Sequence, residues 1–231
     1  MSSTPSAPLV RSLPQARLRS PVGLSYAVVS LIALCALTDL GGLLLAGYGL
    51  GVSGRAAGHD PDGRFDTFYS VLTWFQAMTA LPAGITFVVW LRRVRVNAEV
   101  FRPHGHHHSR PWIFWGWVVP PVCFWYPRRI VLDVWRASTP AGPGGEAPRP
   151  RLWAINVWWA SWLVSSVLTA AAAEPSSDLM GTPGFTEAMV FMIACSVFDM
   201  VAAWFAVTVV RGVTQMQDVM ARTGPVAAGL T

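Results

Sequence analysis

The sequence predicts an all-α membrane protein: a polytopic bundle of four transmembrane helices with a re-entrant or interfacial segment on its cytoplasmic side. Of the 231 residues, 53% are hydrophobic and only 13% are charged, whereas about a quarter of the residues in a typical soluble domain are charged. The hydrophobic residues form four runs, each long enough to supply the roughly 20 residues that cross a hydrocarbon core. The basic residues, all of them arginine, are concentrated in alternate connections, which is typical of a protein oriented in a membrane.

The four expected spans form one membrane domain over 23–211, because no segment outside them is long enough to bury a core of its own. They cover about 24–50, 67–91, 152–173 and 187–210. Residues 1–22 are rich in Ser, Pro and Arg and are expected to form a flexible cytoplasmic tail, and 212–231 a second one. The first run is too long for a signal peptide, whose hydrophobic region has about 7–15 residues.

The charges of the connections predict that both termini are cytoplasmic. The tail before residue 23 carries three arginines, and the connection 92–151 carries ten arginines against three acids. The loop 51–66 has two arginines against three aspartates, and 174–187 has three acids and no base. The tail after residue 210 has two arginines against one aspartate. Because arginine-rich connections stay in the cytoplasm, the signs alternate as four spans require. The use of arginine without lysine is typical of a GC-rich bacterial genome, so the expected location is the bacterial cell membrane.

A fifth hydrophobic stretch, PWIFWGWVVPPVCFWYPRR at 111–129, is expected to dip into the cytoplasmic leaflet or to lie against the bundle without crossing. Only 16 residues separate Pro111 from Arg128. Both flanks are strongly basic, so a crossing would place one group of arginines outside the cell. The Pro120–Pro121 pair also removes backbone donors, and a proline in a helix interior costs about 3 kcal/mol or more.

The segment 128–138 (RRIVLDVWRAS) fits a short amphipathic helix at the membrane surface. With about 3.6 residues per turn, its apolar face carries Ile130, Val131, Val134 and Trp135, and its polar face carries Arg129, Asp133 and Arg136. Arg129 and Asp133 are four residues apart and can form an ion pair. Basic residues with tryptophan at the boundary predict contact with anionic lipid. Residues 139–151 follow as a Pro/Gly linker.

The stretch 90–138 is similar to a known family. It begins with WLRRVRVNA at 90–98, continues with a spaced Trp and Pro pattern, and ends with DVWRAS at 133–138. It resembles the actinobacterial membrane proteins of the family named domain of unknown function 4328, and the flanking pairs of hydrophobic runs fit that family's layout. The resemblance implies an integral membrane protein of a Gram-positive organism with a GC-rich genome, and it implies no activity. We define the interfacial motif of this stretch as Arg92, Asn97, Trp117, Pro120, Pro127, Arg128, Arg129, Asp133, Trp135 and Ser138.

Two acids are expected near the middle of spans, Asp39 in the first and Asp199 in the fourth. A carboxylate at a helix centre costs about 2.5–3.5 kcal/mol on insertion scales, so it normally faces a partner or a cavity. Each acid follows a cysteine by four residues, and in neighbouring antiparallel helices the two acids would meet at similar depth. They could share a proton or hold a cation, or each could bond a neighbouring helix as a structural contact. The plausible polar partners are Gln76, Asn156 and Thr38.

Three further patterns favour structural interpretations. The run HGHHH at 104–108 contains imidazoles that suit zinc, nickel or copper, but no cysteine or acid is nearby in sequence, so a solvated, weakly chelating loop is expected. The cysteines Cys35, Cys123 and Cys195 have no CxxC spacing and are expected to be buried small side chains. The small residues of the first span, Gly47 with Gly51 and Gly42 with Ala46, predict close packing within the bundle, with dimerisation as the alternative.

These observations favour a non-enzymatic integral membrane protein whose cytoplasmic face, over 90–138, is a platform for anionic lipid or for a membrane protein, including a second copy of the chain. The alternative is a small transporter, or a proton or cation pathway, that uses Asp39 and Asp199. No enzyme and no cofactor are expected, because the motifs GxSxG and HExxH and a phosphate-binding glycine loop are missing. The arginines beside the spans are better explained by lipid headgroups than by nucleic acid.

Overall fold

The computed structural model describes residues 18–53, 64–103, 106–140, 152–171 and 184–223, and every regular element in these ranges is a helix. The four long helices are α1 (Val22–Ser53), α2 (Arg64–Phe101), α5 (Leu152–Ala171) and α6 (Phe185–Thr223). All four are long and apolar enough to cross a membrane, which confirms the predicted all-α bundle. The tail 1–17, the end 224–231 and most of the linker 139–151 lie outside the described residues.

Two of the long helices continue well past the expected spans. Helix α2 has 38 residues and α6 has 39, so each is about 57 Å long at 1.5 Å per residue, against a hydrocarbon core of about 30 Å. The segment 212–223, expected to belong to a tail, is therefore helix. The reason is packing: Val94 on α2 and Gln217 on α6 are almost fully buried in these extensions, so neither is free to unwind.

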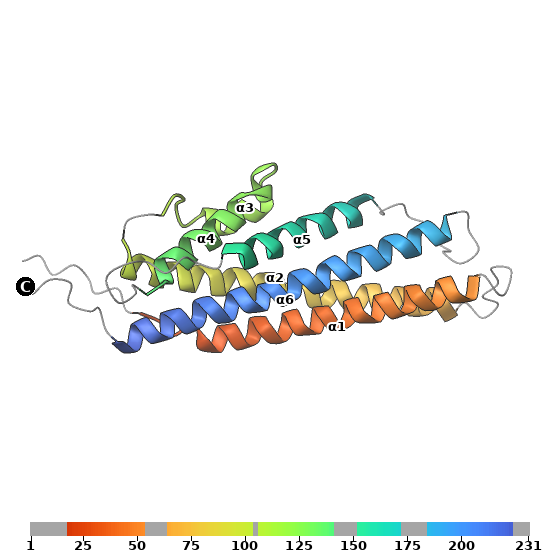
Figure 1. Ribbon diagram of the computed structural model, residues 1–231, viewed down its shortest axis with the longest axis horizontal. Helices are drawn as coiled ribbons and strands as arrows, with labels where there is room; N and C mark the ends of the chain where they lie inside the picture. The colour runs from red at the N-terminus through yellow and green to blue at the C-terminus, as the bar shows by residue number, and fades with distance from the viewer. Residues whose placement is uncertain (1–17, 54–63, 104–105, 141–151, 172–183, 224–231) are drawn as a thin grey trace, which may run out of the picture.

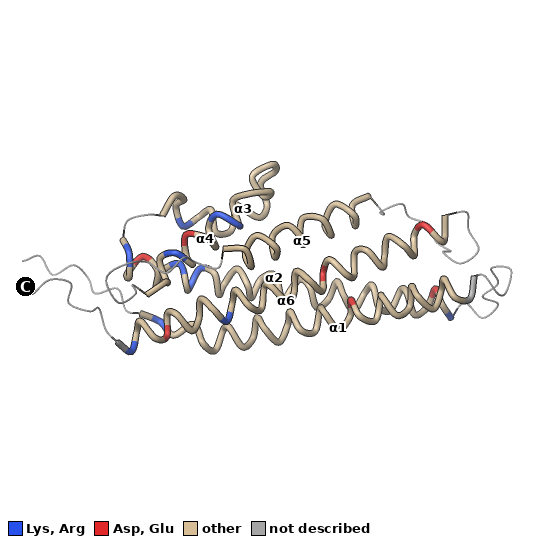
Figure 2. Tube along the Cα trace, in the orientation of Figure 1, with Lys and Arg blue, Asp and Glu red and all other residues tan. Residues whose placement is uncertain are grey.

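The long helices lie side by side along the molecule (Figure 1), and their contacts give the order α2, α1, α6 and α5 around an incomplete ring. Helix α1 packs on α2 and on α6, and α5 packs on α6, whereas α2 and α5 barely touch. The short helices pack beside one end of the bundle, where most of the arginines also gather (Figure 2). We call this end the basic end. The bundle is therefore closed between α2 and α5 only near the basic end.

The hydrophobic stretch 111–129 does not form a span. It folds into helix α3 (Trp112–Val118), a turn with a cis Pro120–Pro121 bond, the 3-10 helix η1 (Val122–Phe124) and the start of helix α4 (Tyr126–Ser138). With seven residues, α3 is about 10 Å long and cannot cross a membrane, so the structure agrees with the expectation of no crossing here. The tip of this α3–η1 segment exposes the apolar side chains Phe114, Trp115, Val118, Phe124 and Trp125.

Helix α4 is amphipathic as expected, but its apolar face packs on protein and not on lipid. Ile130, Val131 and Val134 are each 1% exposed within the main hydrophobic core, and α4 contacts α2, α3, α5 and α6. The expected ion pair between Arg129 and Asp133 is wrong. Asp133 is 4% exposed and accepts hydrogen bonds from the backbone N–H and the Nδ1 of His107. Arg129 and Arg136 are exposed as expected, and only Asp133 was misassigned, because His107 covers it.

Two separate hydrophobic cores leave the middle of the bundle less tightly filled. The larger core lies at the basic end and combines α4 with residues of the long helices, among them Trp90, Leu91 and Val210. The smaller one lies towards the opposite end, where Phe65 and Phe185 make an edge-on ring contact with centroids 5.5 Å apart, beside Ala46 and Met189. Asp39, Gln76 and Asp199 lie between these two cores.

The contact between α4 and α6 depends on a glycine. A Cβ atom at Gly212 would lie 2.8 Å from Cη2 of Trp135, closer than side chains tolerate without moving. We therefore expect Gly212→Ala to lower the unfolding free energy by about 1–3 kcal/mol, the usual cost of overpacking. Thermal unfolding in detergent measures the effect. The matched control is Gly47→Ala on α1, where nothing lies within 4 Å of an added Cβ; equal melting temperatures for the two variants would contradict the prediction.

Candidate functional site

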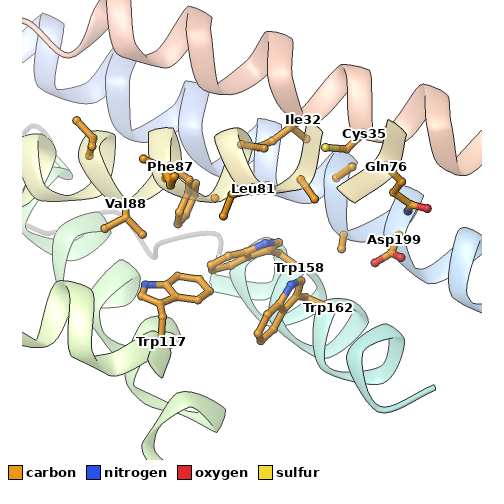
Figure 3. Close-up of a pocket in the computed structure, with 18 of the residues that line it drawn as sticks. Ile32, Cys35, Gln76, Leu81, Phe87, Val88, Trp117, Trp158, Trp162 and Asp199 are labelled. Atoms are coloured by element: carbon orange, nitrogen blue, oxygen red, sulfur yellow. The ribbon is translucent and has the colours of Figure 1, made fainter. Parts of the chain in front are cut away.

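The middle of the bundle contains a cavity of about 730 Å³. Its walls are α2 on one side and α5 with α3 on the other, and its floor is formed by α1 and α6 (Figure 3). Most of the lining is apolar, including Ile32, Leu81, Val88, Ala203 and Ala206. The cavity exists because the backbones of α2 and α5 do not approach closely along this stretch, so that only long side chains such as Phe87 and Trp158 meet across it, while α3 bridges the two helices at the basic end.

The polar groups of the cavity are at one end (Figure 3). Asp39 of α1 and Asp199 of α6 both line it, together with Gln76 and Cys35. Nε2 of Gln76 donates a hydrogen bond to Oδ1 of Asp39, as the sequence suggested, and the side chain of Ser165 on α5 lies near Asp199. The structure thus brings the two predicted acids to one cavity, whereas Thr38 bonds the backbone oxygen of Cys35 and Asn156 bonds Arg128. A role for the acids in ion transport stays a prediction.

Aromatic rings form the other end of the cavity. Trp117 of α3 makes edge-on contacts with Phe87 and with Trp162, at centroid distances of 5.9 Å and 5.7 Å. Phe87 in turn contacts Trp158 at 5.7 Å. The indole N–H of Trp117 is buried and has no hydrogen-bond partner among the described residues. Sequence reasoning placed Trp117 in an interfacial motif and could not assign the other rings to a cavity, because tryptophan in a span is equally typical of lipid contact.

One side of the cavity opens between α2 and α5. The residues along this rim are apolar and largely exposed: Leu81, Ile85 and Val89 of α2, and Phe114 and Val118 of α3. Exposed apolar side chains on a membrane-spanning helix are typical of lipid contact, so we expect the cavity to open towards the hydrocarbon region. None of the described lining residues is basic, and no group of three His, Cys, Asp or Glu side chains suited to a metal ion gathers in the described parts of the chain.

The buried members of the interfacial motif hold the helices together. Nδ2 of Asn97 donates to the backbone oxygen of Arg19 and to Oε1 of Gln217, at 2.9 Å and 3.0 Å. Nε2 of Gln217 donates to the backbone oxygen of Val94 and to Oγ of Ser138, at 2.8 Å and 2.9 Å. These bonds link α2, α4 and α6 with the residues before α1. Gln217 was missed because it follows the last hydrophobic run, where an exposed tail was expected.

Of the remaining residues of the interfacial motif, some are buried and pack against neighbouring helices, and the others lie at the surface. Pro127 is buried in the first turn of α4, where a proline needs no helix hydrogen bond, and Trp135 covers Gly212. Pro120 forms the exposed turn after α3, and Arg128 donates to Asn156 at the start of α5. Only Arg92 and Arg129 of the motif are exposed charges; Arg136, on the last turn of α4, is a third.

The histidine run has several different partners. His107 bonds Asp133, and the ring of His108 stacks on Tyr126 with centroids 4.1 Å apart. Burial lowers the pKa of both His106 and His108, which favours the neutral form of each imidazole. His104 lies outside the described residues.

The small residues of α1 behave in two ways. Gly42 and Ala46 face the bundle: Ala46 is fully buried, and a Cβ at Gly42 would meet Oγ of Ser196 at 3.3 Å. Gly47 and Gly51 are exposed and have open space around them, so close packing within the bundle is wrong for this pair. The two cysteines that precede the aspartates by four residues lie in different surroundings. Cys35 lines the cavity, whereas Sγ of Cys195 accepts a hydrogen bond from Oγ1 of Thr169 at 3.7 Å.

Comparison with known proteins gives one match. The family model described as "Domain of unknown function (DUF4328)" matches residues 62–215, which is about two thirds of the 231 residues. The match runs from just before α2 to near the end of α6, so it includes Asp199 and leaves out α1 with Asp39. No curated protein and no solved structure is significantly similar to the chain.

Proposed function

We propose a function for this chain, which belongs to the DUF4328 family. It is a non-enzymatic integral membrane protein that binds a cation in the cavity between α2 and α5. It serves as a small transporter or cation pathway. The single observation behind this proposal is that Asp39 and Asp199 line one cavity at mid-length of the bundle. The described lining includes no basic residue that would neutralise them.

The charge of the cavity favours this function over a purely structural role for the acids. A structural acid needs one hydrogen-bond partner and no empty space, whereas here two acids from different helices face a large cavity. Acids within membrane spans commonly mark ion pathways. A catalytic role has less support, because the thiol of Cys35 has no histidine or other basic group beside it in the described lining to activate it.

We further propose that the basic end is cytoplasmic, with both termini inside a bacterial cell. The concentration of arginine at one end of the bundle (Figure 2) supports this orientation, since arginine-rich segments resist translocation.

Ion flux in liposomes tests the proposal. We expect purified protein to carry protons or monovalent cations across the bilayer, and we expect Asp39→Asn and Asp199→Asn each to reduce the flux at least about tenfold, since losing one ion-binding charge costs more than 1.4 kcal/mol. The control is Glu187→Gln, an exposed acid in the first turn of α6. A parent protein without flux, or unchanged flux in both asparagine variants that still fold, would refute the cation pathway.

A second function is favoured by the exposed arginines at the basic end. Arg92, Arg129 and Arg136 are exposed, and the apolar tip of the α3–η1 segment lies nearby, so this end also fits a platform for anionic lipid or for a protein partner.

Retention of lipid by the purified protein tests the platform. Changing Arg92, Arg129 and Arg136 to Gln should weaken retention of anionic lipid by about fivefold per arginine, since each is worth about 1 kcal/mol at an anionic surface. Native mass spectrometry of the retained lipids gives the measurement. Arg64→Gln, near the opposite end, is the control, and the same loss in both variants would contradict a localised platform.

A further inference from the structure

We propose that the ligand of the cavity is a hydrophobic organic cation, which enters sideways from the lipid between α2 and α5 and places its charge near Asp39 and Asp199. This inference rests on the proposed function and specifies its substrate class. Four features of the cavity favour this class of ligand: its size, the position of its acids, its aromatic wall and its open side.

The size and lining favour an organic ligand over a simple metal ion. A volume of about 730 Å³ falls within the roughly 300–1,000 Å³ of sites for drug-sized molecules. An inorganic cation needs a close shell of several oxygen ligands, and no group of three acidic, His or Cys side chains occurs among the described residues. A largely apolar cavity of this size instead fits a molecule that buries hydrocarbon.

The polar end selects a positive charge. Asp39 is 4% exposed and lines the cavity; Gln76 bonds one of its carboxylate oxygens, and the described residues supply no partner for the other. Asp199 adds a second acid on the neighbouring helix α6. An anion would be repelled by both carboxylates, and a neutral hydrocarbon would leave the buried carboxylate of Asp39 incompletely bonded.

The aromatic wall supports the same ligand class. Trp117, Trp158 and Trp162 present their rings to the cavity (Figure 3), and tryptophan is the best aromatic partner of an organic cation, at about 0.5–2 kcal/mol per contact. Rings and carboxylates therefore lie along one cavity, where a cation with aromatic or alkyl groups can contact both.

The open side gives the route of entry. The rim consists of exposed apolar side chains of α2 and α3, among them Leu81, Ile85 and Phe114. A hydrophobic cation concentrates in a bilayer, so it reaches this rim from the lipid without crossing a polar entrance.

Calorimetric titration of the full chain in nanodiscs of neutral lipid tests the inference. The probe is tetraphenylphosphonium, and tetraphenylborate is the anion of the same size and shape. We expect saturable binding of the cation alone. Asp39→Asn and Asp199→Asn should weaken it by about 30-fold or more, the usual effect of removing one partner of a buried charge pair, and Trp162→Leu by about 2- to 30-fold. Glu187→Gln should bind as the parent does, and size-exclusion profiles establish that each variant is folded.

The outcomes separate this inference from the proposed function. Flux of protons or potassium that depends on the acids, without binding of tetraphenylphosphonium, would overturn the inference and leave the cation pathway standing. Equal binding of tetraphenylborate would overturn the inference, because the cavity would then select hydrocarbon and not charge. If neither flux nor binding changes in the two asparagine variants, both proposals fail.

Discussion

Gln217→Leu is expected to lower the unfolding free energy by about 3–5 kcal/mol, because it removes the residue that joins α2, α4 and α6. Gln217 is 1% exposed and bonds Asn97, Ser138 and the backbone oxygen of Val94. Leucine fills a similar volume but leaves these groups short of partners, and each buried polar group without a partner costs about 1–3 kcal/mol. The measurement is thermal unfolding in detergent, with an expected drop of about 10 °C.

The matched control for this prediction is two residues away on the same helix. Gln215 is exposed, so Gln215→Leu should change stability by no more than about 0.5 kcal/mol. A similar melting temperature for both variants would show that the hydrogen bonds of Gln217 contribute nothing to stability.

The sequence was sufficient to predict the membrane spans but not the side-chain contacts between the helices. The absence of a crossing at 111–129 followed from two local features, the doubled proline and the basic flanks, which act whatever the rest of the fold does. The pairing of Asn97 with Gln217 joins residues 120 positions apart. No local pattern marks such a pair, and a glutamine beyond the last hydrophobic run is equally typical of an exposed tail.

The two acids of the candidate site could be predicted from the sequence, but the cavity that they line could not. Asp39 and Asp199 stand out because a carboxylate in a span is costly, and Gln76 was a plausible partner because polar residues in spans are few. The cavity depends on the order of the helices around the ring, in which α5 contacts α6 and barely touches α2. That order is a property of tertiary packing. For the same reason Asp133 was assigned to a polar face, although the 106–109 segment covers it.

Gly84→Phe is expected to abolish flux and ligand binding while leaving the fold intact. Gly84 lies on α2, lines the cavity, is exposed, and has no atom within 4 Å of the position of an added Cβ. An aromatic side chain therefore enters free space and meets no neighbour at its base. Because glycine is a poor helix former, its loss from the middle of α2 does not weaken the helix.

The effect of this substitution should exceed that of neutralising one acid, because it acts on the space that both acids share. Asp39→Asn leaves the cavity, the rings and Asp199 in place, so weak binding can persist, whereas a phenyl group at Gly84 excludes the ligand from the cavity whatever its charge. Gly47→Phe, at an exposed position on α1 with equally open surroundings, adds the same side chain away from the cavity and should leave flux in liposomes unchanged. If Gly84→Phe folds and conducts like the parent, the ligand does not pass through this cavity, and the two acids are structural contacts between helices.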